Sequence, residues 1–193
     1  MMERSDTGIW NRVRAGDAQA FAMLFERHAE AIYNYCFRRI GKWESAEDLM
    51  SIVFLEAWRR RSIELPENKI LPWLYGVAGN VVRNEARSQR RFAAALRRLP
   101  EPLSEPDFTE LSDQRADDED VMRNILGLVS QLPRGDLEVF ALCAWSDLTY
   151  EDAAFALGIP VGTVRSRLSR ARAHLRSLSL PEPERKDTSL QEG

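Results

Sequence analysis

The sequence predicts an all-α protein made of two small helical domains. Apolar residues recur at three- and four-residue steps along most of the chain, and no useful stretch alternates with period two. Two arginine-rich segments lie on either side of an acidic one, which divides the chain into two basic parts. We therefore expect a domain at 1–92, a flexible acidic linker at 93–116, a second domain at 117–178 and a disordered tail at 179–193.

Composition limits the class of protein. The 193 residues are 44% hydrophobic and 30% charged, so the chain can bury a core and is too apolar to be disordered throughout. No run of eighteen apolar residues occurs, and the first residues lack the apolar segment of a secretory signal. We expect a cytoplasmic protein without membrane insertion.

The formal charge of −3 conceals three blocks of opposite sign. Residues 81–98 carry a balance of +5, residues 101–120 a balance of −8, and residues 160–176 a balance of +5 with no acid at all. This asymmetry is typical of polyanion-binding modules joined by a linker that repels polyanions. For any one block alone, a solvated helix face is an equally good interpretation.

The first long helix is predicted to begin after Asp17 and to end at Gly41, and a second to begin at Ser45 as N-cap. Phe54, Leu55 and Trp58 fall outside the apolar stripe of that second helix, so either a third helix or a partner must cover them. The stripe consists of Ala46, Leu49, Val53 and Ala57.

A third helix is predicted with Pro72 as its first residue. It contains Gly76 and Gly79, each of which costs about 1 kcal/mol relative to alanine, so packing must compensate or the helix is locally soft. Three prolines then interrupt the pattern within the linker, namely Pro100, Pro102 and Pro106.

The second domain is predicted to hold helices near 118–131 and 134–144, then a tight helical pair ending near Ser177. In that pair Thr149 or Ser146 can cap the first helix, and Gly158 can adopt the positive φ that ends it. The inner side of the second helix consists of Val164, Leu168, Ala171 and Leu175.

The outer side of this last helix combines small and hydroxyl residues with arginines. Such a surface can enter a major groove, where arginines reach guanine or phosphate. We interpret it as a helix-turn-helix, the alternative being an ordinary helical hairpin with an arginine-rich face. The predicted DNA-contacting residues are Gly162, Thr163, Arg165, Ser166, Arg167, Ser169, Arg170 and Arg172.

Residues 132–176 resemble region 4 of sigma-70 family factors, above all the extracytoplasmic-function (ECF) group, in Thr149-Tyr150-Glu151, Leu157-Gly158 and the run from Gly162 to Leu168. Residues 44–60 resemble region 2.2, and residues 72–91 resemble regions 2.3 and 2.4, with no region 3 domain between. The resemblance implies a sigma factor that binds core RNA polymerase, recognises promoter −35 and −10 elements and helps to open the DNA.

The resemblance further implies that the second helix docks on a coiled coil of the largest polymerase subunit. The residues agree, because an apolar strip edged by charge is what partner helices often present. The alternative is that Ile52 and Leu55 only meet a neighbouring helix. The predicted polymerase-binding residues are Asp48, Ser51, Ile52, Leu55 and Arg59.

The third helix would contact the −10 element, where opened strands favour aromatic platforms, amides and arginines. Asn80 matches an asparagine of the family's −10-reading region, whereas Trp73 and Tyr75 are better explained as core residues. The predicted −10 residues are Trp73, Asn80, Arg83, Asn84, Arg87, Arg90 and Arg91.

Departures from the family pattern bear on the preferred promoter. Gly76 and Gly79 stand where larger, often basic residues are common, Asn84 where aspartate is frequent, and Ala153 where a bulkier aliphatic is usual. The acidic linker is either a soluble tether or, as in the family, a segment that occupies positively lined polymerase channels. The resemblance also implies an anti-sigma factor as partner.

An enzyme acting alone is the least supported class. The two histidines lie on helices without a nucleophile arrangement, and no phosphate loop or metal-ligand spacing occurs, so we expect no cofactor and no metal. Cys36 and Cys143 are interpreted as buried small hydrophobes. The main alternative is a stand-alone helix-turn-helix regulator with an N-terminal sensing or dimerisation domain, and a pure protein-interaction module is a third.

Overall fold

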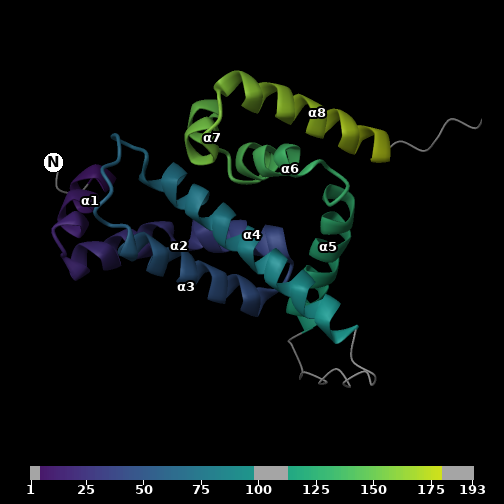
Figure 1. The fold of residues 1–193 in the computed structure, drawn as a ribbon, viewed down its shortest axis with the longest axis horizontal. Helices are drawn as coiled ribbons and strands as arrows, with labels where there is room; N and C mark the ends of the chain where they lie inside the picture. Colours follow the sequence, from purple (N-terminus) through teal and green to yellow (C-terminus); the bar gives the residue numbers. More distant parts are fainter. Residues whose placement is uncertain (1–4, 98–112, 180–193) are drawn as a thin grey trace, which may run out of the picture.

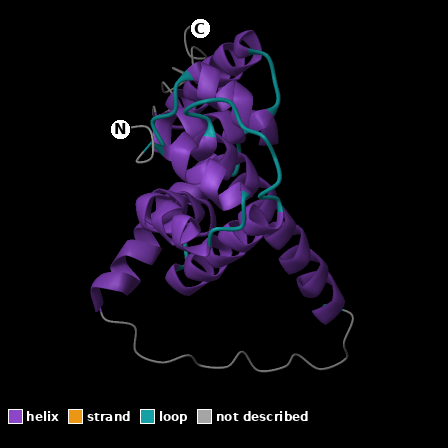
Figure 2. Ribbon diagram, turned by 90° about the vertical axis from the view of Figure 1, so that its left-hand side faces the viewer, coloured by secondary structure: helices purple, strands orange, loops and turns teal. Residues whose placement is uncertain are grey.

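The computed structural model describes residues 5–97 and 113–179, and every regular element within them is helical (Figures 1 and 2). The helices are α1 Asp6–Arg14, α2 Ala18–Ile40, α3 Trp43–Arg59, α4 Ile70–Leu96, α5 Asp113–Val129, α6 Arg134–Phe140, the π-helical turn η2 Ala141–Trp145, α7 Tyr150–Leu157 and α8 Val161–Ser179. The all-α prediction is confirmed for these residues. Helices α4 and α5 include the two ends of the predicted linker, whose middle lies outside the described residues, as does almost all of the predicted tail.

Helices α1 to α4 form the N-terminal unit. The predicted ends of α2 are confirmed: the Asp17 carboxylate accepts hydrogen bonds from the amides of Gln19 and Ala20, and Gly41 ends the helix at φ 74°. These backbone donors, together with the Arg12 guanidinium, hold the pKa of Asp17 below its usual value. The predicted stripe of α3 is buried as expected.

Two predicted helix starts in the N-terminal unit are wrong. Helix α3 begins at Trp43, not after Ser45, and the Trp43 amide donates to the Glu119 carboxylate of α5 at 2.9 Å. This acceptor lies 76 residues further along the chain, so no local pattern could predict it. Helix α4 begins at Ile70, two residues before Pro72, which its first turn accommodates because amides there have no intrahelical acceptor.

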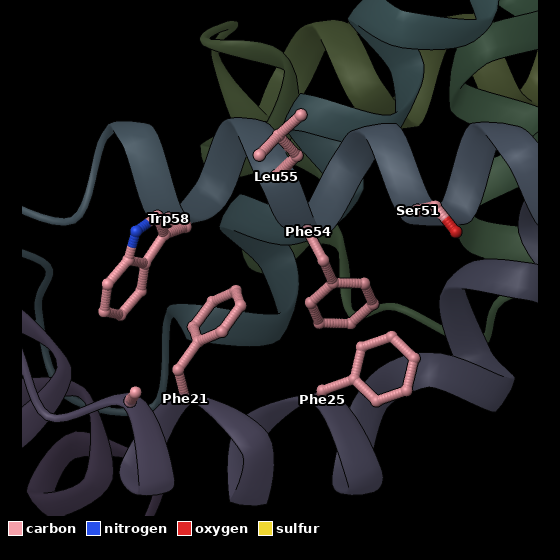
Figure 3. A pocket seen from close by; sticks show the side chains of 7 residues that line it. Phe21, Phe25, Ser51, Phe54, Leu55 and Trp58 are labelled. Atoms are coloured by element: carbon pink, nitrogen blue, oxygen red, sulfur yellow. The ribbon is translucent and has the colours of Figure 1, made fainter.

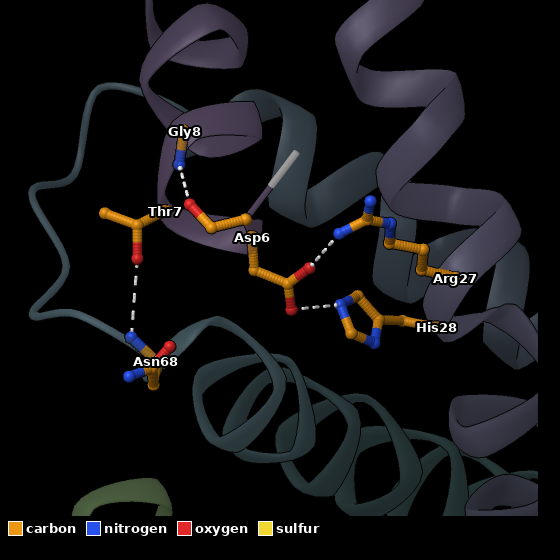
Figure 4. A network of polar contacts seen from close by, with 7 residues as sticks. Asp6, Thr7, Gly8, Arg27, His28 and Asn68 are labelled. Carbon is orange, nitrogen blue, oxygen red and sulfur yellow. Dashed lines mark hydrogen bonds and ion pairs between the residues drawn. The ribbon is translucent and has the colours of Figure 1, made fainter. Parts of the chain in front are cut away.

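Helix α1 was missed by the sequence analysis, and a small polar network holds it in place (Figure 4). The Asp6 carboxylate accepts from Arg27 at 2.9 Å and lies 2.8 Å from Nε2 of His28, which is itself buried. The Trp10 indole N–H donates to the carbonyl of Ile63 in the loop before α4. His28 therefore joins α1 to α2, which is a structural role.

Helices α5 to α8 form the C-terminal unit, and its predicted turn is confirmed. The Thr149 hydroxyl accepts from the Asp152 amide at the start of α7, and Gly158 ends α7 at φ 63°. Val164, Leu168 and Ala171 of α8 are buried, as predicted. Helix α5 starts at Asp113, five residues before the predicted 118.

The two units pack directly on one another, which the sequence did not indicate. Figure 1 shows α6, α7 and α8 lying over α4, and one continuous apolar cluster runs from α4 into the second unit. It includes Leu74 and Ala78 from α4 with Leu142 and Ala153. Helix α2 also contacts α5, and α4 contacts α7, so both pairs join the two units.

The cysteines are shielded, in agreement with their interpretation as hydrophobic side chains. Cys36 is fully buried, and this burial raises the pKa of its thiol to about 12; burial also raises the pKa of the half-buried Cys143. We expect Cys36 to resist iodoacetamide in the native protein at mildly alkaline pH and to react fully after denaturation. Mass spectrometry of peptides measures both states, and rapid native labelling of Cys36 would contradict the burial.

Candidate polymerase and nucleic-acid interfaces

The predicted polymerase-binding residues all lie on the exposed face of α3. Ile52 and Leu55 keep 44% and 48% of their surface exposed, so the neighbouring helices cover them only in part. Asp48, Ser51 and Arg59 are exposed on the same helix. Arg59 also pairs with Glu56 at 2.8 Å, and its side chain is nevertheless largely exposed to solvent.

Beside this face lies an apolar groove of about 430 Å³ between α2 and α3 (Figure 3). Phe54 points down from α3 towards Phe25 of α2, with ring centroids 4.7 Å apart, and Phe21 packs against Trp58 in the same way at 5.1 Å. Leu55 stands at the rim, pointing away from these rings. The exposed strip is therefore continuous with a firm aromatic surface.

The predicted DNA-contacting face of α8 is mostly open. Gly162, Arg165, Ser166, Ser169 and Arg172 are exposed. The Arg165 guanidinium lies 5.8 Å from the centre of the Tyr150 ring, which presents it at the start of the helix.

Two arginines of the same set have partners inside the unit. Arg170 donates two hydrogen bonds to the buried carboxylate of Asp136, at 2.9 and 3.1 Å, and this partner raises the pKa of Arg170. The Arg167 guanidinium lies against the backbone of Gly135, where an added Cβ would come within 2.8 Å of it. Both side chains therefore have structural contacts in addition to any contact with DNA.

Several predicted −10 residues line a cavity of about 600 Å³ between the two units. Asn80, Arg83, Asn84 and Arg87 of α4 face this space, and Arg167 of α8 lines it as well. The structure thus brings together members of both predicted DNA-binding sets. Trp73 lies elsewhere, half-buried with its ring 5.1 Å from Trp10, which favours the core interpretation.

Arg83 is the most constrained member of the −10 set. It pairs with Glu138 of α6 at 2.8 Å and also donates to the side-chain oxygen of Asn80. Both charged side chains of the pair are largely shielded from solvent, which strengthens their attraction.

A second groove, of about 430 Å³, is lined by apolar side chains and by arginines. Arg90 lines it together with Arg39, whose Nη1 atom is buried without a hydrogen-bond partner in the described part of the chain. The sequence analysis missed Arg39 and Arg134 because both become part of a cationic surface only when the two units meet. Arg91 is exposed on α4.

Within residues 5–97 and 113–179, no cluster of histidine, cysteine, aspartate or glutamate is placed to hold a metal ion. Among the same residues, no helix combines the length and apolar character needed to cross a membrane.

The fold and these surfaces define a two-part helical protein with a helix-turn-helix unit and an exposed apolar strip on its other unit. Comparison with known proteins identifies the family to which this class of protein belongs. The family described as "Sigma-70 region 2" matches residues 24–92, and "Sigma-70, region 4" matches residues 122–175. The chain belongs to the ECF group of the sigma-70 family of RNA polymerase sigma factors. Sigma factors are transcription initiation factors and not enzymes.

Two relatives match over nearly their full length. RNA polymerase sigma factor CarQ of Myxococcus xanthus is 30% identical over 167 residues, 86% of this chain and 93% of the relative. The ECF RNA polymerase sigma-E factor of Haemophilus influenzae is 28% identical over 174 residues, covering 87% and 92%. The solved structure of CnrH in complex with the cytosolic domain of CnrY aligns with a TM-score of 0.67 at 25% identity, over 90% of this chain and 96% of that one.

Proposed function

We propose that this chain directs transcription initiation as an ECF sigma factor: it binds core RNA polymerase, contacts −35 and −10 promoter elements and helps to open the DNA. The observation that carries the proposal is the presence, in one chain, of an exposed polymerase-type docking strip and an exposed arginine-rich helix-turn-helix face. These lie in the two units that match regions 2 and 4.

Core polymerase binding is assigned to the exposed face of α3. Ile52 and Leu55 form an apolar strip edged by Asp48, Ser51 and Arg59, and the aromatic groove beside it adds a rigid apolar surface. An exposed apolar patch with a polar rim is characteristic of protein interaction sites.

Promoter contact is assigned to two separate surfaces. The exposed N-terminal half of α8 would read the −35 element in the major groove, with Arg165 as its principal cation. The α4 residues Asn80, Arg83, Asn84 and Arg87 would hold the −10 strand through amide and phosphate contacts. Because several arginines neutralise phosphates, binding should weaken steeply with salt.

The proposal includes an anti-sigma partner, since CnrH was solved with the cytosolic domain of CnrY and RpoE of Bartonella quintana with the anti-sigma factor NepR. It also places the site of action in the cytoplasm, where bacterial polymerase and promoters are found. The role of the acidic linker stays a prediction, because residues 98–112 lie outside those the structure describes.

Run-off transcription tests the proposal directly. Purified core polymerase is incubated with genomic fragments, with and without the chain, and defined transcripts are expected only when both are present. A stand-alone regulator would instead bind a symmetric site tightly without polymerase. Failure to associate with core polymerase, together with such unaided binding, would overturn the sigma-factor function in favour of the regulator.

A further inference from the structure

The second groove, formed by α2, α4, α5 and α6, carries positive charge that its own lining does not balance. Every charged side chain that lines it is an arginine, and no aspartate or glutamate is among the lining residues. Its volume of about 430 Å³ is typical of pockets that hold small molecules. The lining arginines are Arg39, Arg83, Arg87, Arg90 and Arg134.

Only two of these arginines have a carboxylate partner in the described part of the chain. Arg83 and Arg134 both pair with Glu138, at 2.8 and 3.5 Å, so they share a single negative charge. The groove therefore has an excess of positive charge that attracts anions. The arginines without such a partner among the described residues are Arg39, Arg87 and Arg90.

Arg39 is the most unusual of the three, because its Nη1 atom is buried without a hydrogen-bond acceptor among the described residues. Its place in the last turn of α2 suits a cation, and its guanidinium lies 5.9 Å from the centre of the Tyr35 ring. Neither feature gives Nη1 an acceptor, and a buried charged donor without one is costly. An anion in the groove would supply the acceptor after a rotation of the Arg39 side chain.

The rest of the lining is apolar, which indicates that the ligand is more than a bare ion. Inorganic phosphate would leave these side chains in contact with water, whereas an aromatic or aliphatic group attached to the phosphate would cover them, which is favourable. The apolar lining residues include Ile40, Val82, Leu126, Val129, Leu132 and Leu137.

We propose that the second groove is a binding site for a small organic phosphate, in which the arginines hold the phosphate and the apolar side chains cover an aromatic or aliphatic body. Phosphate fits better than a single carboxylate because it can carry two charges and accept hydrogen bonds from several guanidinium groups. The proposal goes beyond the proposed function, and its test requires no transcription.

Arg39 separates this site from the promoter-binding surface. Arg87 and Arg90 are exposed on α4 and belong to the predicted −10 set, so a DNA strand could contact them from outside the groove. Arg39 is on α2, is partly buried and belongs to neither predicted DNA-binding set. Loss of Arg39 should therefore weaken binding of a small ligand more than binding of DNA.

Calorimetric titration of the full chain tests the site, in magnesium-free buffer at physiological ionic strength, where attraction between exposed charges is weak. The probes are pyrophosphate, ADP and decyl phosphate, which present phosphate alone, with an aromatic base, and with an aliphatic chain. We expect ADP or decyl phosphate to bind at least about tenfold more tightly than pyrophosphate, because the apolar lining is then covered. Equal affinities for all three probes, or no binding of any of them, would overturn the proposal.

The decisive variants compare two arginines. Arg39→Gln should weaken binding of the preferred probe at least about tenfold, because a charge-assisted hydrogen bond is lost. Arg91→Gln is the matched control, since Arg91 is exposed on α4 and does not line the groove; its effect should stay within about twofold. Equal affinities of the two variants would contradict the assignment, and thermal unfolding verifies that both keep the fold.

A third variant tests the groove without removing any charge. Ser130 lines the groove and is exposed, so the side chain of Ser130→Trp should fill the groove and abolish binding of the probe. Retention of full affinity in this variant would place the bound probe elsewhere and overturn the proposal.

Binding of short, mixed-sequence single-stranded DNA is measured on the same variants. Arg39→Gln should change DNA affinity by less than about twofold. An equal loss of probe and DNA binding would make Arg39 part of the nucleic-acid surface and overturn a separate small-molecule site. Absence of run-off transcription would refute the proposed function, while the calorimetric result would still decide whether the groove binds an organic phosphate.

Discussion

Replacing Leu55 by aspartate is expected to weaken binding to core RNA polymerase at least ~30-fold, about 2 kcal/mol, as substitution at the centre of an interface does. Leu55 is 48% exposed, and its side chain stands at the rim of the aromatic groove on α3. Placing a charge there disrupts the apolar strip without entering the core. The free energy of unfolding should therefore change by no more than about 0.5 kcal/mol.

Interferometry with immobilised core polymerase measures this affinity, and thermal unfolding verifies the fold. Arg60→Ala is the control, because Arg60 is an exposed charged residue on a different face of the same helical segment. Its affinity for polymerase should match that of the unmodified chain. Equal binding by Leu55→Asp and Arg60→Ala would show that this face of α3 is not where polymerase docks.

Substituting Arg165 and Arg170 separately is expected to distinguish DNA contact from structural support. Arg165→Ala should lower run-off transcription about tenfold, corresponding to one lost base or phosphate contact of 1–3 kcal/mol, and leave Tm unchanged. Arg170→Ala should instead lower Tm by about 5 °C, because the buried Asp136 carboxylate loses the partner that donates two hydrogen bonds to it. Holoenzyme transcription and scanning calorimetry provide the two measurements.

The double variant Asp136→Ala/Arg170→Ala is the control for the second effect. Removing both partners leaves no buried carboxylate unsatisfied, so the double variant should be more stable than Arg170→Ala alone. If Arg170→Ala left Tm unchanged, or if Arg165→Ala lowered Tm as much, the division of roles within α8 would be wrong.

The features that the sequence predicted well are those set by neighbours in the chain. Asp17 and Thr149 cap helices by accepting from amides two or three residues away, and Gly41 and Gly158 end helices by adopting positive φ. The buried stripe of α8 and the exposure of Arg165 follow from the three- and four-residue spacing of apolar residues. A helical face can be predicted from spacing because the period of the helix is constant.

The DNA-contacting residues were predicted as two separate surfaces. Whether a single arginine on these surfaces stays exposed or is held in an ion pair depends on partners that lie far away in the chain. Arg165 stays exposed, but Arg83 and Arg170 are held by Glu138 and Asp136, which lie 55 and 34 residues away in the chain. Nothing in the local pattern distinguishes these three arginines. Their different environments arise only when α6 packs between α4 and α8.

The sequence by itself determined that the protein consists of helices, where most of them end, and which faces carry positive charge, because these depend on spacing and on backbone preferences within a few residues. Tertiary structure alone decided that Glu119 caps α3, that the backbone of α7 approaches α4 closely at Gly76, and that Arg83 pairs with Glu138. The physical reason is that each of these contacts joins groups from different helices, whose meeting depends on how the whole chain buries its apolar surface.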